Sequence, residues 1–304
     1  MGPSAANHAT DTTIVNAMSI DVEDYFHANA LAAAAPMARW DSLESRVVRN
    51  TDRFVDMFAA ARVRATFFIL GWIAERHPDL VRRIHAAGHE IASHGYAHQL
   101  TYDLTPAAFG EDVRRARQLL EDQTGVRVRG YRAPSYSITM RSLWALDVLV
   151  AEGYEYDASI FPIRHDRYGI PHAPRHAYVL TRLGRRLLEA PPSTVRVLGT
   201  NLPIAGGGYF RLLPYAWTRW GIARVNRHER RPVIFYLHPW EIDPDQPRLD
   251  VGTLSRFRHY RNLHLTESRL RRLLSEFAFA PLADVLAAAE ISAETQLWAE
   301  PATA

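Results

Sequence analysis

Short apolar runs rich in β-branched and aromatic residues alternate with amphipathic stretches along most of the chain. An apolar run of this kind predicts a strand, whereas apolar residues recurring three and four apart predict a helix. The predicted strands lie at residues 13–22, 64–70, 89–94, 128–134, 154–161, 194–200 and 233–241. The predicted helices lie at residues 42–63, 78–88, 105–125, 140–153, 215–228 and 266–277. So many alternating units predict an α/β fold with a closed or nearly closed barrel, and catalysis at the C-terminal ends of its strands.

Polar residues follow four of the predicted strands, where such a barrel would hold an active site. They are Asp21, Glu23 and Asp24 after the first strand, His94 after the third, Arg132 after the fourth and His238 after a late one. Core packing does not explain polar residues at the ends of four separate strands. This placement therefore predicts an enzyme.

The residues His94 and His98 lie four apart, so either a helix or a strand would direct both imidazoles to one side. Two neutral imidazoles suit Zn, Co, Ni or Fe equally well, although an isolated pair is more often a polar surface feature. Gly95 occupies the place of the general-base glutamate of the zinc proteases, which excludes that class. A catalytic metal also requires a third protein ligand and an open position for water.

The acidic cluster after the first strand could supply that ligand. Asp21, Glu23 and Asp24 are three carboxylates within four residues, and they would repel one another unless a cation or an arginine lies nearby. A solvated acidic turn is the alternative interpretation. Because an apolar run precedes the cluster and Tyr25 and Phe26 follow it, we expect it to face a partly buried cleft. One carboxylate could then bind a metal while Asp21 serves as a base.

Two further strand-end residues carry charge. Arg132 could form a bidentate pair with a carboxylate and hold it ionised, or it could form an ordinary surface salt bridge. His238 follows a continuous apolar strand and precedes Pro239 and Trp240. A histidine in this position is either structural or an imidazole tuned for acid–base chemistry.

Composition narrows the class of protein. The chain has 36 Lys+Arg against 33 Asp+Glu, and no basic patch is interleaved with aromatics, so we expect no nucleic-acid partner. It has no cysteine, which excludes disulfides, thiolate metal sites and a cysteine nucleophile. We find neither a signal-peptide pattern nor a membrane-spanning run. The expected location is therefore cytoplasmic, with peripheral association with an export machinery as an alternative and no integral membrane segment.

Taken together, the motifs resemble those of the polysaccharide deacetylases of carbohydrate esterase family 4, the NodB-homology group. The resemblance covers roughly residues 14–242 and rests on the segments "SIDVEDYF", "SHGYAH", "YRAPSY", "YDASIFP" and "LHPWE". In further detail the chain resembles the subgroup associated with exosortase-type exopolysaccharide clusters. That likeness rests on "DVEDYFH", "DASIFPIRHDRYGIP", "HPWEIDPDQP" and "FRHYRNLHLTESRLRRLL".

The resemblance implies a distorted (β/α) barrel of the NodB-homology type with fewer than eight regular units. The domain would span residues 14–290, including a C-terminal extension from about residue 242. A disordered N-terminal segment at residues 1–13 and a flexible tail at residues 291–304 would flank it.

The resemblance also implies a divalent metal, with zinc expected first and Co²⁺ or Ni²⁺ as alternatives. His94, His98 and one carboxylate of the first motif would hold this ion. Alternation along a strand favours Glu23, which would lie on the same side as Asp21. If the ligand position of the first motif, "SIDVEDYF", has to hold an aspartate, Asp24 is favoured instead.

The implied reaction removes N-acetyl groups from N-acetylglucosamine-type residues of a polysaccharide or its precursor, in exopolysaccharide biosynthesis. Asp21, kept ionised by Arg132, would act as the base, and protonated His238 would donate to the leaving amine. A backbone N–H near Ser135 or Tyr136 would face the oxyanion. An allantoinase-like amidase acting on a small cyclic amide is one alternative, and a non-catalytic sugar-binding protein is another.

Overall fold

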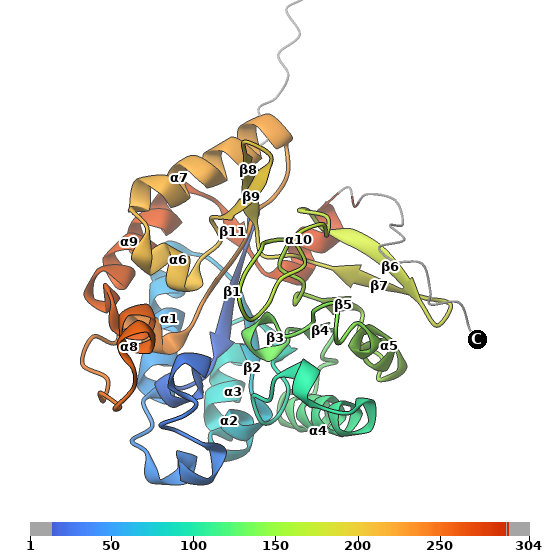
Figure 1. Cartoon of the computed structure of the whole chain (residues 1–304), viewed down its shortest axis with the longest axis vertical. Helices are drawn as coiled ribbons and strands as arrows, with labels where there is room; N and C mark the ends of the chain where they lie inside the picture. Colours follow the sequence, from blue (N-terminus) through green and yellow to red (C-terminus); the bar gives the residue numbers. More distant parts are fainter. Residues whose placement is uncertain (1–13, 290, 292–304) are drawn as a thin grey trace, which may run out of the picture.

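The computed structural model describes residues 14–289 and residue 291. Its helices are arranged around a central sheet (Figure 1). The segments expected to be disordered (1–13) and flexible (291–304) lie outside the described residues, apart from residue 291.

Within the described residues the central sheet has nine strands, of which eight follow the order β10-β1-β2-β3-β4-β5-β7-β6 and β11 pairs with β1. Every pair is parallel except β6 with β7, which form an antiparallel hairpin. The strands are β1 (Asn16–Val22), β2 (Thr66–Ile69), β3 (Glu90–Ser93), β4 (Gly130–Tyr131), β5 (Tyr156–Asp157), β6 (Tyr178–Arg182), β7 (Arg185–Glu189), β10 (Ile234–Leu237) and β11 (Phe279–Ala280). Strands β1, β2, β4, β5 and β10 are fully buried, as expected where helices cover a parallel sheet.

Ten α-helices lie in the described part of the chain, and most of them connect successive strands (Figure 1). They are α1 (Val47–Ala61), α2 (Gly71–Arg76), α3 (Pro78–Ala86), α4 (Pro106–Thr124), α5 (Trp144–Ala151), α6 (Gly207–Leu212), α7 (Tyr215–Arg224), α8 (Thr253–Tyr260), α9 (Leu263–Glu276) and α10 (Leu282–Ala288). The α4 helix follows its sequence closely, because the Thr105 hydroxyl caps its first turn and Gly125 ends it with a φ of 70°.

Irregular backbone closes the gap between β7 and β10. The Ser193 N–H, shortly after β7, donates to the Ile234 carbonyl on β10 at 3.2 Å, and the Tyr236 N–H donates to the Ala205 carbonyl at 3.0 Å. Gly206 is required here, because a Cβ on this residue would lie 1.8 Å from the Tyr236 carbonyl oxygen. The sheet is therefore a distorted (β/α) barrel with fewer than eight regular units, which confirms the expected fold class.

One predicted strand has a different role from the one expected. Residues 194–200 were expected to extend the barrel, but β8 (Thr194–Val197) pairs with β9 (Thr200–Pro203) in a separate two-stranded sheet. The β6–β7 hairpin was not predicted. Its exposed charged positions, including Arg185 and Arg186, interrupt the apolar pattern on which strand prediction depends.

Two buried carboxyl groups meet at the ends of β5 and β7. Burial raises the pKa of Asp157 to about 6 and raises the pKa of Glu189 well above its usual range, and Glu189 donates a hydrogen bond to Asp157. Asp157 in turn accepts from the Ser159 hydroxyl at 2.5 Å, and that hydroxyl accepts from the Ala133 N–H at 2.7 Å. This chain of hydrogen bonds supports the backbone directly after Arg132.

The shared proton makes stability depend on pH. In the unfolded chain Glu189 ionises above its ordinary pKa of 4.5, whereas in the folded protein it stays protonated to higher pH. The contribution of Glu189 to the stability of the folded state is therefore lost as pH rises from about 4.5 through the pKa of the folded state. The free energy of unfolding should fall by up to about 1.4 kcal/mol per pH unit in this window. Glu189→Gln keeps the donor without ionising, and urea unfolding between pH 5 and 9 should show a flatter profile. The exposed Glu155→Gln should keep the wild-type profile, and an equal slope for wild type and Glu189→Gln would contradict this account.

Candidate active site

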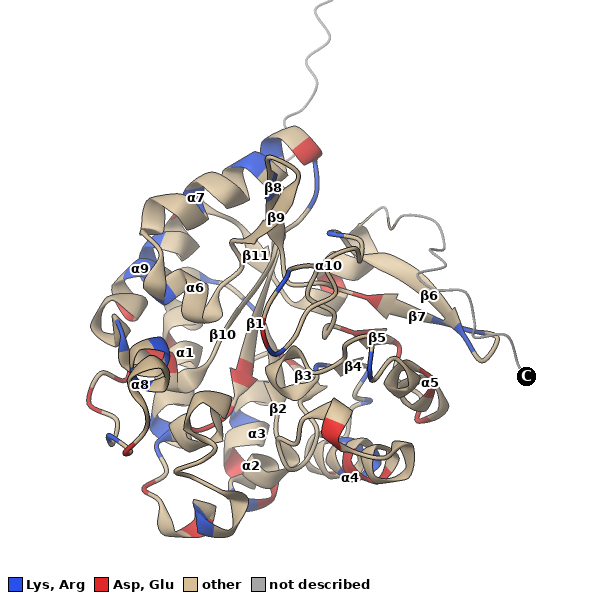
Figure 2. Cartoon of the chain, viewed as in Figure 1, with Lys and Arg blue, Asp and Glu red and all other residues tan. Residues whose placement is uncertain are grey.

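Five of the seven site residues predicted from the sequence line one cavity at the C-terminal ends of the strands. Acidic residues lie at this end of β1 in the middle of the molecule (Figure 2). The cavity has a volume of about 190 Å³, and its walls include Asp21, Glu23, His94, His98 and His238. These residues come from three separate strand ends, so the placement expected for a barrel enzyme is the one observed.

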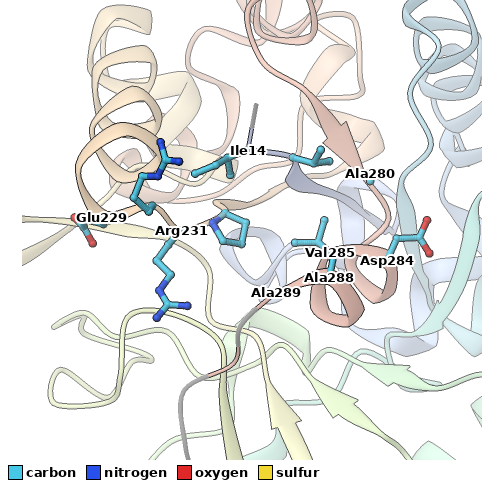
Figure 3. Close-up of a pocket in the computed structure, with 11 residues that line it drawn as sticks. Ile14, Glu229, Arg231, Ala280, Asp284, Val285, Ala288 and Ala289 are labelled. Carbon is cyan, nitrogen blue, oxygen red and sulfur yellow. The ribbon is translucent and has the colours of Figure 1, made fainter. Parts of the chain in front are cut away.

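A larger cavity of about 610 Å³ lies elsewhere, between the start of β1, the segment before β10 and α10 (Figure 3). Ile14, Pro232, Val285 and Ala288 contribute to its walls. None of the site residues predicted from the sequence lines this cavity.

Glu23, His94 and His98 form a group that could hold a metal ion. One ligand atom from each residue lies within 4.8 Å of the others. His94 Nδ1 lies 2.7 Å from the Arg132 carbonyl oxygen, so its Nε2 is the nitrogen available to a ligand. Burial lowers the pKa of His94 to about 4, and the neutral imidazole is the form that binds a metal.

The Glu23 carboxylate has one supported oxygen and one unsatisfied oxygen. Oε1 accepts from Trp240 Nε1 at 3.0 Å. Oε2 lies 2.7 Å from His98 Nε2, yet it is buried and accepts no hydrogen bond. Burial opposes the charge of Glu23, but His98 and His238 outweigh it and hold the pKa of Glu23 well below its usual range. An ionised carboxylate with a free oxygen beside two imidazoles fits a divalent cation such as zinc.

The loop between His94 and His98 is neither helix nor strand, contrary to both geometries considered from the sequence. Asp112 on α4 holds it, because its carboxylate accepts from the Tyr96 N–H at 2.8 Å and the Ala97 N–H at 3.1 Å. Gly95 has a φ of 73°, and a Cβ there would lie 2.7 Å from Asp112 Oδ2. The glycine therefore permits the turn that brings His98 back to Glu23.

Asp24, the other candidate ligand, lies outside this group because its carboxylate serves a helix end. Oδ2 accepts from the Ser45 hydroxyl at 2.7 Å and from the N–H groups of Arg46 and Val47 at 2.8 and 3.1 Å. Oδ1 accepts from the Tyr25 N–H at 3.0 Å. The Oδ2 donors lie at the start of α1, whose first N–H groups lack partners within the helix, and the Oδ1 contact caps the 3₁₀ turn Tyr25–His27. The geometry therefore selects Glu23 over Asp24 as the carboxylate of the group.

Matched amide variants of the two neighbours should separate these roles. Glu23→Gln removes the charged ligand and should weaken Zn²⁺ binding by more than about 10-fold. Asp24→Asn should leave Zn²⁺ binding unchanged but lower the free energy of unfolding by about 1–3 kcal/mol, because an NH₂ group would face backbone donors. Metal titration and urea unfolding measure the two effects, and a metal loss confined to Asp24→Asn would reverse the assignment.

Asp21, in the cavity wall, forms a buried ion pair with Arg132 behind it. Arg132 Nη1 lies 2.6 Å from Asp21 Oδ1 and also donates to the Ser19 hydroxyl at 2.8 Å. The guanidinium packs over the Phe68 ring at 4.1 Å. The contact with Asp21 uses one guanidinium nitrogen and is not the bidentate pair considered from the sequence, because Nη2 makes no hydrogen bond. Both side chains are buried, so the surface salt bridge is excluded as well.

His238 faces two carboxylates with one ring nitrogen and a third carboxylate with the other. Nε2 lies 3.8 Å from Asp21 Oδ2 and 3.6 Å from Glu23 Oε1. Nδ1 lies 2.9 Å from Glu241 Oε2. Burial opposes a charge on this imidazole, but the three carboxylates outweigh it and raise the pKa of His238 to about 9. The ring is therefore protonated at neutral pH.

Four residues that hold the site together were not predicted from the sequence: Trp240, Glu241, Arg211 and Asp112. Trp240 and Glu241 lie within the "LHPWE" motif, so their position beside His238 was the available signal. Asp112 and Arg211 lie in a helix and after a glycine run, where nothing in the local sequence distinguishes them from surface residues.

The fold and this site place carboxylates and a histidine in one cavity at the strand ends of a barrel, a combination on which acid–base catalysis can draw. Residues 40–155 match the polysaccharide deacetylase family, and residues 158–287 match a domain of unknown function, DUF3473. Residues 40–155 thus match a polysaccharide deacetylase domain, and the chain is similar to chitooligosaccharide and peptidoglycan deacetylases.

Curated relatives match about a third of the chain. It is 41% identical over 106 residues to a chitooligosaccharide deacetylase from Sinorhizobium fredii, covering 33% of this chain and 44% of that protein. It is 29% identical over 108 residues to a peptidoglycan deacetylase from Helicobacter pylori, covering 36% of each. The chain thus spans less than half the length of these two relatives.

Solved structures share the fold over nearly the whole chain. A crystal structure from Mycobacterium smegmatis assigned to the polysaccharide deacetylases has a TM-score of 0.64 at 20% identity and covers 95% of both chains. The structure of Puue allantoinase has a TM-score of 0.60 at 17% identity and covers 90% of this chain and 88% of that one. None of the helices in the described residues is both long and apolar enough to span a bilayer.

Proposed function

We propose that the protein is a metal-dependent hydrolase that removes N-acetyl groups from N-acetylglucosamine-type residues of a polysaccharide or its precursor, in exopolysaccharide biosynthesis. One observation carries the proposal: Asp21 and His238 lie in the same buried cavity as the Glu23–His94–His98 group. A base, an acid and three potential metal ligands in one cavity are the groups that amide hydrolysis requires.

Glu23, His94 and His98 would hold the divalent cation, for which we propose zinc. Three protein ligands of nitrogen and oxygen type leave a position open, as in catalytic zinc sites. A cation bound there would lower the pKa of its bound water and polarise the acetyl carbonyl.

Asp21 would accept the proton of the attacking water. Arg132 holds this carboxylate through Oδ1 at 2.6 Å, so Oδ2 is the oxygen that faces the cavity and His238. Arg132 therefore fixes the orientation of the carboxylate that would act as the general base. The same residue also orients His94 through its backbone carbonyl, so one arginine positions both the base and a ligand.

His238 would donate a proton to the leaving amine. Its Nε2 points into the cavity toward Asp21 and Glu23, and its raised pKa of about 9 keeps it in the donor form at neutral pH. The amine nitrogen is a poor leaving group unless it is protonated, so this step is essential for an amide substrate.

The backbone after Arg132 supplies a donor for the developing oxyanion. Ser135 and Tyr136 both have positive φ values, of 53° and 55°, which are strained for non-glycine residues. The Tyr136 N–H donates to the Ala133 carbonyl at 3.1 Å. Ser135 lines the cavity, and we assign its N–H, of the two considered, to the oxyanion.

Sugar recognition is supported by aromatic residues in the cavity wall. Tyr136, Tyr168 and Trp240 line it, and aromatic rings can pack against the apolar faces of sugar rings. The sequence identity to a chitooligosaccharide deacetylase favours a chitooligosaccharide-type substrate.

An allantoinase-like amidase is the second candidate, because the structural similarity to Puue allantoinase is close to that of the deacetylase. Metal-loaded protein should be assayed for acetate release from N-acetylated chitooligosaccharides and, in parallel, for hydrolysis of allantoin. The proposal predicts acetate release and no turnover of allantoin. Allantoin hydrolysis without acetate release would replace the proposed function with the second one.

A further inference from the structure

The part of the chain that matches a domain of unknown function supplies the surroundings of His238. This segment, residues 158–287, contains β10, the turn after it and helices α6 and α8. Glu241, in this segment, contacts Nδ1 of His238, whereas Nε2 of the same ring faces Asp21. The contacts form a continuous chain of buried polar groups.

Glu241 makes the first of these contacts. Pro239 begins a short 3₁₀ turn, Pro239–Ile242, that folds Glu241 back onto His238. Glu241 Oε2 accepts from the His238 backbone N–H at 3.1 Å and lies 2.9 Å from His238 Nδ1. Glu241 is fully buried, so its carboxylate is shielded from solvent. Both contacts fix the side chain of His238 relative to its own backbone.

Arg211 on α6 holds Glu241 in place. Its Nε donates to Glu241 Oε1 at 2.6 Å. Its Nη1 donates to the carbonyls of His259 and Arg261 at 2.9 and 3.0 Å, and its Nη2 donates to the carbonyl of Arg258 at 3.0 Å. Arg211 is 2% exposed. All three guanidinium nitrogens are used, so the position of Glu241 is set by the C-terminal end of α8.

Trp240, in the same segment, also restrains the ring of His238. Its ring stacks on His238 at 5.1 Å and on His259 at 4.3 Å, and its Nε1 donates to Glu23. Gln246 Nε2 donates to the Trp240 carbonyl at 2.8 Å, and Gln246 Oε1 lies 2.7 Å from His259 Nε2. The segment thus restrains both the acid and one ligand of the metal group.

Asp157, the carboxylate of the "YDASIFP" segment, is engaged elsewhere. It pairs with Glu189 and accepts from Ser159. Of the described carboxylates, Glu241 is the one that forms a hydrogen bond with His238 Nδ1.

We propose that Glu241, fixed by Arg211, is a positioning residue for His238, and that residues 158–287 therefore complete the active site instead of forming an accessory domain. The proposal rests on the proposed function, in which His238 protonates the leaving amine. Glu241 accepts the Nδ1–H, which directs Nε2–H at the substrate. When the Nε2 proton passes to the amine nitrogen as the C–N bond breaks, Nδ1 keeps its proton and its bond to Glu241. A carboxylate that orients a catalytic imidazole in this way fixes both its tautomer and its direction.

The test compares two substrates that differ in their need for the acid. Glu241→Gln should lower kcat for acetate release from chitooligosaccharides by about 10²-fold, with KM and zinc content changed little. The rate with 4-nitrophenyl acetate should change less than about 3-fold, because its phenolate leaving group departs without a proton. Equal losses on both substrates, or no loss on the amide, would overturn the proposal.

Glu229→Gln is the matched control. Glu229 also lies between an arginine and a histidine, with Arg175 Nη2 at 3.1 Å and His176 Nε2 at 2.8 Å, but it precedes β10 at the opposite end of the strand. This variant should retain the wild-type kcat on both substrates. A loss equal to that of Glu241→Gln would show a general effect of removing a partly buried carboxylate.

A double-mutant cycle guards against a purely structural effect of Glu241→Gln. In a His238→Asn background, Glu241→Gln should lower kcat less than about 2-fold further, because two residues that act as one unit are not additive. A further 10²-fold loss in that background would overturn the proposal.

A proton NMR measurement tests the contact without any substrate. A downfield His238 Nδ1–H signal should be present in the wild type and in Glu229→Gln and absent in Glu241→Gln. Absence of this signal from the wild type would overturn the positioning role of Glu241, whether or not acetate is released. Failure of acetate release while the signal is present would refute only the proposed function.

Discussion

Asp21→Asn should reduce acetate release by about 10²–10⁴-fold while leaving Zn²⁺ binding unchanged. The amide keeps the shape of the side chain but has no basic oxygen to accept the proton of water. Asp21 is not part of the Glu23–His94–His98 group, so the metal affinity should not follow the loss of turnover. Steady-state kinetics and metal titration on the same preparation measure both quantities.

The stability of this variant has to be measured with its activity. Arg132 is fully buried and contacts Asp21 at 2.6 Å, so removing the negative charge should lower the free energy of unfolding by about 3–5 kcal/mol. Turnover is therefore compared well below the unfolding midpoint. Retention of more than about a tenth of the wild-type kcat by the folded variant would exclude Asp21 as the base.

His94→Ala and His98→Ala should each abolish metal loading and turnover together. Each removes one of three ligands, and losses above about 100-fold are expected, because removal of residues that only support the ligands already costs about 10–100-fold. Zinc content after dialysis and the rate of acetate release should fall in parallel. His172→Ala, an exposed histidine, should change neither.

The two histidine variants also separate the metal group from simple packing. His94 is held by the Arg132 carbonyl at 2.7 Å, whereas the loop anchored by Asp112 positions His98. These supports are independent, so a common loss of metal in both variants points to a shared ion. If His94→Ala retained metal and activity, the proposed mechanism would be wrong.

The parts of the fold that the sequence predicted are those with strong local signals. The α4 helix was expected at 105–125, and it spans Pro106–Thr124 because a threonine cap and a terminal glycine mark both ends. The strand β10 was expected from a continuous apolar run, and it is fully buried. The hairpins β6–β7 and β8–β9 join segments that are adjacent in the chain, but the exposed residues Arg185 and Arg186 leave β7 without a comparable apolar pattern.

The same distinction applies to the site. His94, His98, Arg132 and His238 follow strands, so barrel geometry alone brings them together. The choice between Glu23 and Asp24 was open in the sequence because the start of α1, which engages Asp24, is positioned by tertiary structure. For the same reason Arg211, 30 residues before Glu241 in the chain, could not be paired with it from the sequence.

The most direct test of the central claim is acetate release from N-acetylated chitooligosaccharides by chelator-treated protein before and after addition of Zn²⁺. Our account predicts no release after chelation and recovery of the original rate when one equivalent of Zn²⁺ is restored. The Glu23→Gln variant should not recover under the same conditions. Acetate release that is unaffected by chelation would contradict the account.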